Sequence, residues 1–284
     1  EKQAESAREK AAAARATQAR VDQRRRAKAI LSSVVAIAVV IAVIAIVAIN
    51  HKTPLNPNGN RTAAAQAIVD GVTGVTPATY NPVGQGNASL SAVKAISDPP
   101  LTAGGKPQVL FVGAEFCPFC AAERWSLIQA LSRFGTFSNL SQVRSATGDG
   151  NLATFSFYKS SYTSKYLSFD GIEYEDRAQN HLMTLTKSQQ ATWLKYTGQG
   201  SFPFMDVGGK YAITNAGYPD TDLSALNWTQ ITADITDPST TVGKDILGEA
   251  NVLTAMICKL TNGQPASVCS ASGLTAIKLP TASA

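Results

Sequence analysis

The sequence is poor in the side chains that usually bind metal ions, and it lacks a glycine-rich phosphate loop. It holds two His and four Cys among 284 residues, and neither His51 nor His181 has the spacing of a metal site. Charged residues make up only 16% of the chain, but hydrophobic residues make up 44%, which excludes general disorder. We therefore expect a folded protein without a metal ion or other cofactor.

Basic charge is also missing from most of the chain. The net charge of +5 is carried by residues 1–28, which contain nine Lys or Arg and four Asp or Glu. The remaining residues hold 16 basic and 16 acidic side chains, so their formal charge is zero. A nucleic-acid-binding domain needs a basic patch or stripe, so nucleic acid is not an expected partner.

One long hydrophobic run is present, at residues 30–49. It consists of Ile, Val, Ala and Leu apart from two serines, and a helix of this length spans about 30 Å, the thickness of the bilayer core. The positive-inside rule predicts a single-pass plasma-membrane protein with a cytoplasmic basic helical tail at residues 1–29 and an extracytoplasmic domain on the periplasmic side. Its basis is the cluster of basic residues just before the run, namely Arg24, Arg25, Arg26 and Lys28.

The four cysteines fall into two pairs, Cys117 with Cys120 and Cys258 with Cys269. An even number of cysteines in an extracytoplasmic domain favours disulfide bonds. A four-cysteine zinc site needs two closely spaced pairs, which the second pair does not provide. Two interpretations of Cys117 and Cys120 remain possible: a pair that is active in redox chemistry, or a permanent disulfide. Cys258 and Cys269 are predicted to form a structural disulfide. The alternative is that these two cysteines pass electrons to Cys117 and Cys120.

Beyond the membrane run, the pattern changes at residue 107. Residues 50–106 are predicted to be a linker and a wrapped extension, with one short helix at 61–70 that Gly71 ends. Residues 107–270 have the pattern of a folded α/β domain, and residues 271–284 form a C-terminal tail. Within the domain, periodicity predicts strands at 108–113, 152–158 and 166–169, helices at 118–134, 187–196 and 249–260, and a hairpin of 203–207 with 210–213.

Two short segments carry a resemblance to known proteins. VGAEFCPFC, at residues 112–120, resembles the active-site strand and turn of thioredoxin-like proteins, and Phe202-Pro203 resembles their cis-proline loop. The stretches TFSFYKSSYTSKYLSF and SFPFMDVGGKY are similar to the domain of unknown function 929 family of actinobacterial and archaeal membrane proteins, and this likeness covers residues 85–270. The resemblance implies a thioredoxin-like α/β domain with an insertion near residues 160–198, preceded by a single transmembrane helix.

The first cysteine of such a motif lies at a helix N-terminus. Unpaired backbone N–H groups and the helix dipole there favour thiolate over thiol. Cys117 would therefore attack a client disulfide, and Cys120 would resolve the mixed disulfide. The resemblance implies that Pro203 lies against the pair, and that Phe202 and Phe119 contact the client.

One departure from the thioredoxin pattern concerns acidic residues. Many thioredoxins have a buried acid six residues before the first cysteine, where this chain has Phe111. Glu115 is expected to lie in a solvated turn, as is the acidic cluster of Glu173, Glu175 and Asp176. Proton transfer would then be slow or would pass through water.

Two functions fit these residues. The first is a membrane-anchored extracytoplasmic thiol–disulfide oxidoreductase, whose partners are protein thiol clients, and the CPFC motif favours it. The second is a non-catalytic accessory subunit of a larger membrane complex, either respiratory or for envelope assembly. The missing buried acid, the bulk of Phe202 and the long helix-prone tail favour this second function. The lipid bilayer is an expected partner in both.

Overall fold

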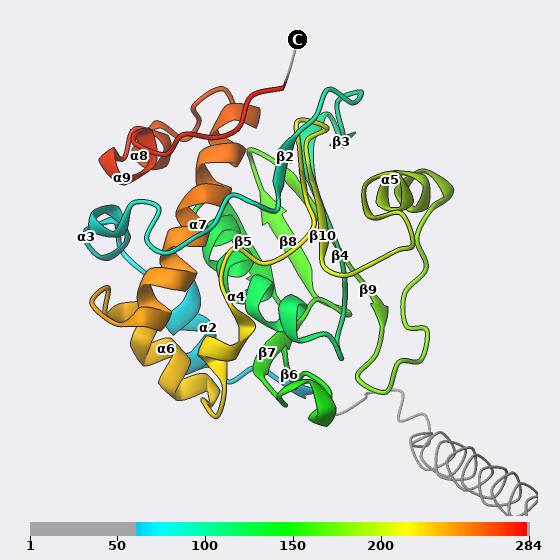
Figure 1. The fold of residues 1–284 in the computed structure, drawn as a ribbon. Helices are drawn as coiled ribbons and strands as arrows, with labels where there is room; N and C mark the ends of the chain where they lie inside the picture. Colours follow the sequence, from blue (N-terminus) through cyan, green and yellow to red (C-terminus); the bar gives the residue numbers. More distant parts are fainter. Residues whose placement is uncertain (1–60, 283–284) are drawn as a thin grey trace, which may run out of the picture. The chain divides into compact units, whose positions relative to one another are not determined.

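The computed structural model describes residues 61–282, and its centre is a mixed β-sheet (Figure 1). The central strand β4 (Lys106–Ala114) pairs in parallel with β9 (Ser168–Glu175) and antiparallel with β10 (Phe204–Val207). β11 (Tyr211–Ile213) forms a hairpin with β10. The order along the sheet is therefore β11-β10-β4-β9.

The stretch before β4 extends this sheet. β2 (Val93–Ala95) pairs antiparallel with β11 and forms the edge strand on that side. β3 (Thr102–Ala103) pairs with the first two residues of β4. The part of the chain that is predicted to wrap on the domain thus contributes two strands to its central sheet.

The two faces of β4 contact separate hydrophobic clusters. Phe111 belongs to the larger cluster, together with residues of α4 (Pro118–Ser132) and α7 (Thr241–Leu260). Val112, which points to the opposite face, packs in a smaller cluster with α5 (Lys187–Thr197). Figure 1 shows α5 on one side of the sheet and α4 with α7 on the other. Because helices cover both faces, β4 is a nearly continuous hydrophobic run.

Capping residues explain where two of the surrounding helices begin. The Thr186 side chain accepts a hydrogen bond from the Gln189 N–H, and the Gln189 side chain bonds back to Thr186, which starts α5. Asn227 and Gln230 form the same capping box at the start of α6 (Trp228–Thr236).

The remaining elements are short, with two to eight residues each. They are β1 (Thr62–Ala63), α2 (Gln66–Thr73), α3 (Pro77–Tyr80), η1 (Asn81–Val83), β5 (Gly135–Ser138), β6 (Ser141–Arg144), η2 (Thr147–Asp149), β7 (Ala153–Ser156), β8 (Ser161–Ser164), η3 (Asp220–Leu223), α8 (Ala266–Cys269) and α9 (Ser272–Thr275).

The mixed α/β class and most of the elements predicted in the domain are confirmed, but the predicted place of the insertion is wrong. β9 lies within residues 160–198 and is the parallel neighbour of β4. Residues 135–164 instead form strands of two small sheets, β5-β8 and β1-β6-β7, outside the central sheet. β9 has the polar sequence SFDGIEYE, so hydrophobicity alone did not reveal a central strand.

The bounds predicted for two helices are also wrong. α2 begins at Gln66 and continues through Gly71 instead of ending there. Gly71 allows close packing, because a Cβ at this position would lie 2.0 Å from Cγ2 of Thr232 in α6. α7 begins at Thr241, about two turns before the predicted start at residue 249.

The predicted transmembrane helix at 30–49 and the predicted tail at 1–29 lie outside the described residues. Within residues 61–282, no helix is both long enough and apolar enough to cross a membrane.

Candidate functional site

The two cysteines of the CPFC motif lie where β4 passes into α4. Cys117 is the N-cap residue of α4, and its Sγ accepts a hydrogen bond from the backbone N–H of Cys120 at 3.3 Å. Pro118 is the first helical residue, where its missing N–H costs no hydrogen bond. Both cysteines are free thiols, with Cys117 only 5% exposed and Cys120 fully buried. The structure therefore places both sulfurs together at a helix N-terminus.

The two thiols differ in acidity. The hydrogen bond from the Cys120 thiol lowers the pKa of Cys117, and the Cys120 N–H and the charge of Arg124 act in the same direction, against the effect of burial. Burial raises the pKa of Cys120 well above its ordinary value, and the hydrogen bond and charge of Cys117 raise it further. Cys117 is thus the more acidic of the two thiols, and Cys120 is the less acidic one.

The segment before β10 lies against this pair. β10 pairs antiparallel with β4, so the loop that enters β10 lies beside the loop that leaves β4. The peptide bond between Phe202 and Pro203 is cis, and the Cys117 thiol donates to the Phe202 carbonyl oxygen at 3.8 Å. The structure therefore brings together Cys117, Cys120 and the Phe202–Pro203 segment, which are far apart in the sequence.

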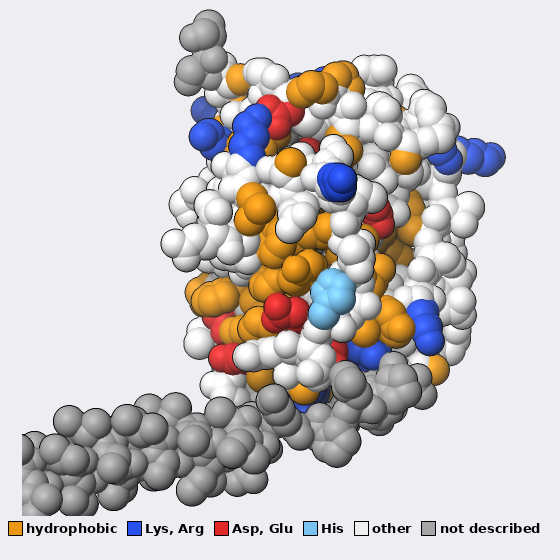
Figure 2. Space-filling model, turned by 90° about the vertical axis from the view of Figure 1, so that its right-hand side faces the viewer, with side chains coloured by type: hydrophobic (Ala, Val, Ile, Leu, Met, Phe, Trp, Pro, Cys, Tyr) orange, Lys and Arg blue, Asp and Glu red, His pale blue; other side chains and the backbone are white. Residues whose placement is uncertain are grey.

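Aromatic side chains gather next to the pair, on the side of the sheet that carries α5. The Phe202 ring contacts Phe116, with centroids 6.2 Å apart, and stacks on Trp193 at 5.2 Å. Tyr174 of β9 packs against both Trp193 and Phe202. Phe119, within the CPFC motif, is 41% exposed. Figure 2 shows hydrophobic side chains collected at the centre of this face.

A fully buried ion pair, which was not predicted from the sequence, also belongs to this region. Arg124 of α4 donates to both carboxylate oxygens of Glu173 in β9, at 2.9 and 2.5 Å, and to the Ala114 carbonyl oxygen at 2.9 Å. The prediction that Glu173 lies in a solvated turn is wrong, and Asp176 beside it is also buried. One signal was available, because Arg124 is the only basic residue between Cys117 and Ser132.

Glu115 is buried as well, so the prediction that it is solvated is wrong. Its carboxylate accepts hydrogen bonds from Arg61 at 2.5 Å and from the Ser156 hydroxyl at 2.5 Å. Burial raises the pKa of Glu115, and the charge of Glu173 raises it further, whereas Arg61 and Ser156 lower it. The turn is covered by β7, which supplies Ser156, and by the residue before β1, and neither contact is visible in the local motif.

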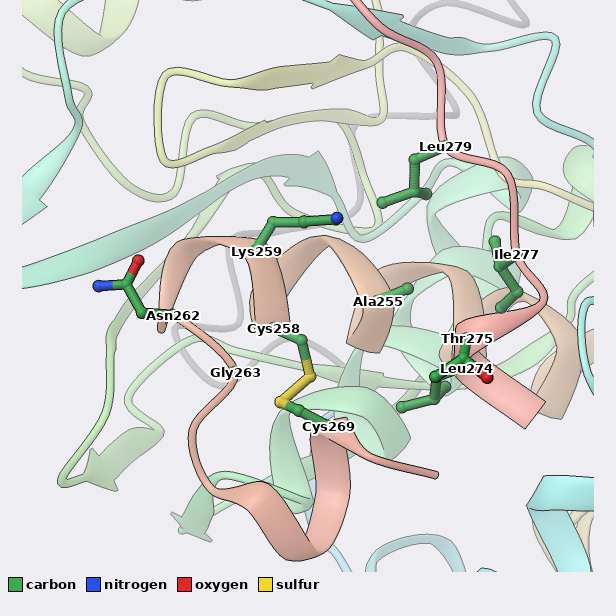
Figure 3. Close-up of a pocket in the computed structure, with 10 residues that line it drawn as sticks. All are labelled: Ala255, Cys258, Lys259, Asn262, Gly263, Cys269, Leu274, Thr275, Ile277 and Leu279. Atoms are coloured by element: carbon green, nitrogen blue, oxygen red, sulfur yellow. A yellow bond between two sulfur atoms is a disulfide. The ribbon is translucent and has the colours of Figure 1, made fainter. Parts of the chain in front are cut away.

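Cys258 and Cys269 form a disulfide between the last turn of α7 and α8, with their Cα atoms 5.6 Å apart. The sequence separation of 11 means that the bond closes a short loop. The disulfide lies in the wall of an open cavity of about 370 Å³. Figure 3 shows it together with Leu274, Thr275, Ile277 and Leu279 of the C-terminal segment, which also line this cavity.

The disulfide and the CPFC motif lie at opposite ends of two helices that run side by side. Glu123, in the first half of α4, interacts with Glu249 of α7, and Arg133, just after α4, hydrogen bonds to Asn251 and Thr254 further along α7, so the two helices run in the same direction. The motif lies at the start of α4, about 20 Å from that contact. Direct thiol–disulfide exchange needs contact between sulfurs, so this placement does not support the alternative of a shuttle pair.

The thiols of Cys117 and Cys120 are the reactive groups of this site. Two neighbouring thiols of different acidity are the groups that thiol–disulfide exchange requires. In residues 61–282, no cluster of three or more His, Cys, Asp or Glu side chains has an arrangement that could hold a metal ion.

Comparisons with known proteins identify a family for the chain. No curated protein matches it, and no solved structure does. The family model described as a domain of unknown function (DUF929) matches residues 92–259, more than half of the chain. The match includes the CPFC motif, the ion pair and the Phe202–Pro203 segment. The chain therefore belongs to the DUF929 family.

Proposed function

We propose that the protein is a membrane-anchored thiol–disulfide oxidoreductase of thioredoxin-like fold that acts on protein thiols outside the plasma membrane. The observation that carries the proposal is the position of Cys117. It is the N-cap residue of α4, it is the more acidic of two adjacent thiols, and it lies against the Phe202–Pro203 segment.

The order of elements supports the thioredoxin-like part of the proposal. β4 leads through α4 to its parallel neighbour β9, and α5 then leads to the antiparallel hairpin of β10 and β11. α7 follows the hairpin and packs on the same face as α4. This is the order expected of a thioredoxin-like domain with long insertions.

The chemistry follows from the two acidities. The Cys117 thiolate attacks one sulfur of a client disulfide and forms a mixed disulfide, while the other client sulfur leaves as a thiolate and takes up a proton. Cys120 then loses its proton and attacks the Cys117 sulfur, which releases the second client sulfur. Two electrons pass to the client, and Cys117 and Cys120 become a disulfide. The reverse sequence oxidises a client dithiol.

Trapping of the mixed disulfide tests the proposal. With Cys120→Ser, the intermediate cannot be resolved, so we expect adducts on the full-length protein that a thiol reductant removes. The matched control, Cys117→Ser, keeps the same number of thiols but has no attacking sulfur, and it should trap none. A Cys117–Cys120 pair that stays in one redox state across a full range of glutathione buffers would refute the proposal.

The membrane anchor rests on residues 30–49 and the basic residues before them. We expect the protein to stay in the membrane fraction after alkaline carbonate washing. A membrane-impermeant thiol reagent added to intact cells should reach Cys117, whereas a tag at the N-terminus should stay protected from added protease. Release of the protein by carbonate would contradict the anchor.

A second function, the non-catalytic accessory subunit, is favoured by one observation. Both sulfurs are nearly or fully buried, and the Phe202 backbone contacts the attacking one. In that case the domain would bind other membrane subunits, and a complex extracted in mild detergent should survive Cys117→Ala. Extraction as a monomer alone would refute this alternative.

A further inference from the structure

The charge environment of the cysteine pair centres on Arg124. Its side chain is fully buried and is fixed at three points, by two hydrogen bonds to Glu173 and one to the Ala114 carbonyl oxygen. Glu173 is held in turn, because its carboxylate also accepts the Phe157 N–H at 3.0 Å. The guanidinium is therefore a cation in a defined position that water does not reach.

This cation lies next to the sulfurs. The Ala114 carbonyl oxygen that accepts from Arg124 also accepts the backbone N–H of Cys117 at 3.2 Å. The guanidinium carbon lies 5.7 Å from the centre of the Phe111 ring. A Cβ added at Gly113 would contact both that ring and, at 3.4 Å, the Cys120 sulfur. Arg124 and the two thiols therefore meet around residues 111–114.

The groups around the guanidinium leave one of its N–H groups without an acceptor among the described residues. Glu173 of β9 is its ion-pair partner, while Glu115, just after β4, is already paired with Arg61. The Nη1 group of Arg124 is buried and has no hydrogen-bond partner among the described residues. An unpaired buried N–H of a charged group is costly, and a nearby negative charge reduces that cost. The cysteine pair is where such a charge forms.

We propose that Arg124 is the positioning residue that stabilises the Cys117 thiolate, and that Glu173 limits this effect by balancing part of its charge. The inference rests on the proposed function. In this protein a buried cation, Arg124, would act on the cysteine pair in place of the buried acid of the thioredoxin pattern, and its ion-pair partner Glu173 would set the strength of that effect. The pKa of Cys117 agrees with it, since the Arg124 charge adds to the stronger effect of the Cys120 hydrogen bond.

The test uses two substitutions within one ion pair that should act in opposite directions. Arg124→Gln removes the cation, so the thiolate fraction of Cys117 should fall about tenfold at neutral pH. Glu173→Gln removes the counter-charge and should increase that fraction. Both are read from the pH dependence of Cys117 alkylation in the reduced full-length protein, with the labelled peptide identified by mass spectrometry.

A merely structural role predicts a different pattern. Loss of either partner would then loosen the same buried site and change the alkylation profile in the same direction for both variants. That outcome, or unchanged profiles in folded variants, would overturn the inference. If Arg124→Gln fails to fold, Glu173→Gln and the doubly neutral Arg124→Gln/Glu173→Gln still decide it, because only the former should increase the thiolate fraction.

The two experiments distinguish a failure of the inference about Arg124 from a failure of the proposed function. If no client is ever trapped but the two profiles shift in opposite directions, the oxidoreductase proposal fails and the role of Arg124 stands. If clients are trapped but the profiles do not move, the reverse holds.

Discussion

At the scale of single residues, the protein buries acids that the proposed thiol chemistry does not use. Glu123 of α4 and Glu249 of α7 meet between the two helices, and neither carboxylate oxygen of Glu123 has a hydrogen-bond donor among the described residues. We expect the two carboxyls to share a proton, which would supply that donor. Burial raises the pKa of Glu123 well above its ordinary value and that of Glu249 to about 7.

This pair gives stability a specific pH dependence. A carboxyl whose pKa is higher in the folded than in the unfolded protein stabilises the fold at low pH, and this contribution is lost as pH rises through the folded value. Between about pH 5 and pH 8, the free energy of unfolding should therefore fall. Glu123→Gln keeps a donor toward Glu249 without a titrating proton, so at about pH 8 it should be more stable than the parent by on the order of 2 kcal/mol.

Urea unfolding of the two proteins at a series of pH values checks this prediction. The difference between them isolates the carboxyl pair from other titrating groups, including Cys117. Parallel stability profiles for Glu123→Gln and the parent would show that the two acids share no proton.

At the scale of elements, the packing of α2 on α6 depends on Gly71. An added Cβ would lie 2.0 Å from Cγ2 of Thr232. Gly71→Ala should therefore lower the free energy of unfolding by about 1–3 kcal/mol, even though Ala favours helix formation. Thr232→Ser removes the clashing methyl group, so the double variant should recover most of the loss. Chemical unfolding measures both changes.

Gly148 offers a matched control for this prediction. A Cβ there would meet no atom within 4 Å, so Gly148→Ala should change stability by less than about 0.5 kcal/mol. If Thr232→Ser does not relieve Gly71→Ala, the cost arises from the helix backbone and not from the contact between α2 and α6.

The elements also show what could be predicted from the sequence. β4, α4, α5 and the hairpin of β10 with β11 are marked by hydrophobic runs, caps and turn residues that lie close together in the chain. These local signals also locate Cys117 and Cys120 at the start of a helix.

The parts that could not be predicted depend on contacts between distant residues. Arg124 and Glu173 are 49 positions apart, and only their pairing makes a buried charge in β9 possible. Glu115 is covered in the same way by Arg61 and Ser156, which are 54 and 41 positions from it. A charged residue is predicted to be exposed unless its partner is known. Glu115 and Glu173 were therefore predicted to be solvated, although both are buried.

At the scale of the whole molecule, the two cysteine pairs lie at separate places. The CPFC thiols lie at the start of α4, whereas the Cys258–Cys269 disulfide joins the far end of α7 to α8. Distant sites without shared partners contribute independently to stability and function. The disulfide should therefore affect how stable the fold is, and not how the CPFC pair exchanges.

The double variant Cys258→Ser/Cys269→Ser tests this separation. Loss of a disulfide that closes a loop of this length should lower the free energy of unfolding by about 3 kcal/mol. The equilibrium of the Cys117–Cys120 pair with glutathione should change less than about twofold, because among residues 61–282 the sulfurs of the two pairs share no hydrogen-bond partner. Urea unfolding and quantitative thiol labelling measure the two quantities on the same preparation. A change of tenfold or more in the glutathione equilibrium would mean that the C-terminal disulfide acts on the CPFC pair through α4 and α7, and the two pairs would then form one redox system.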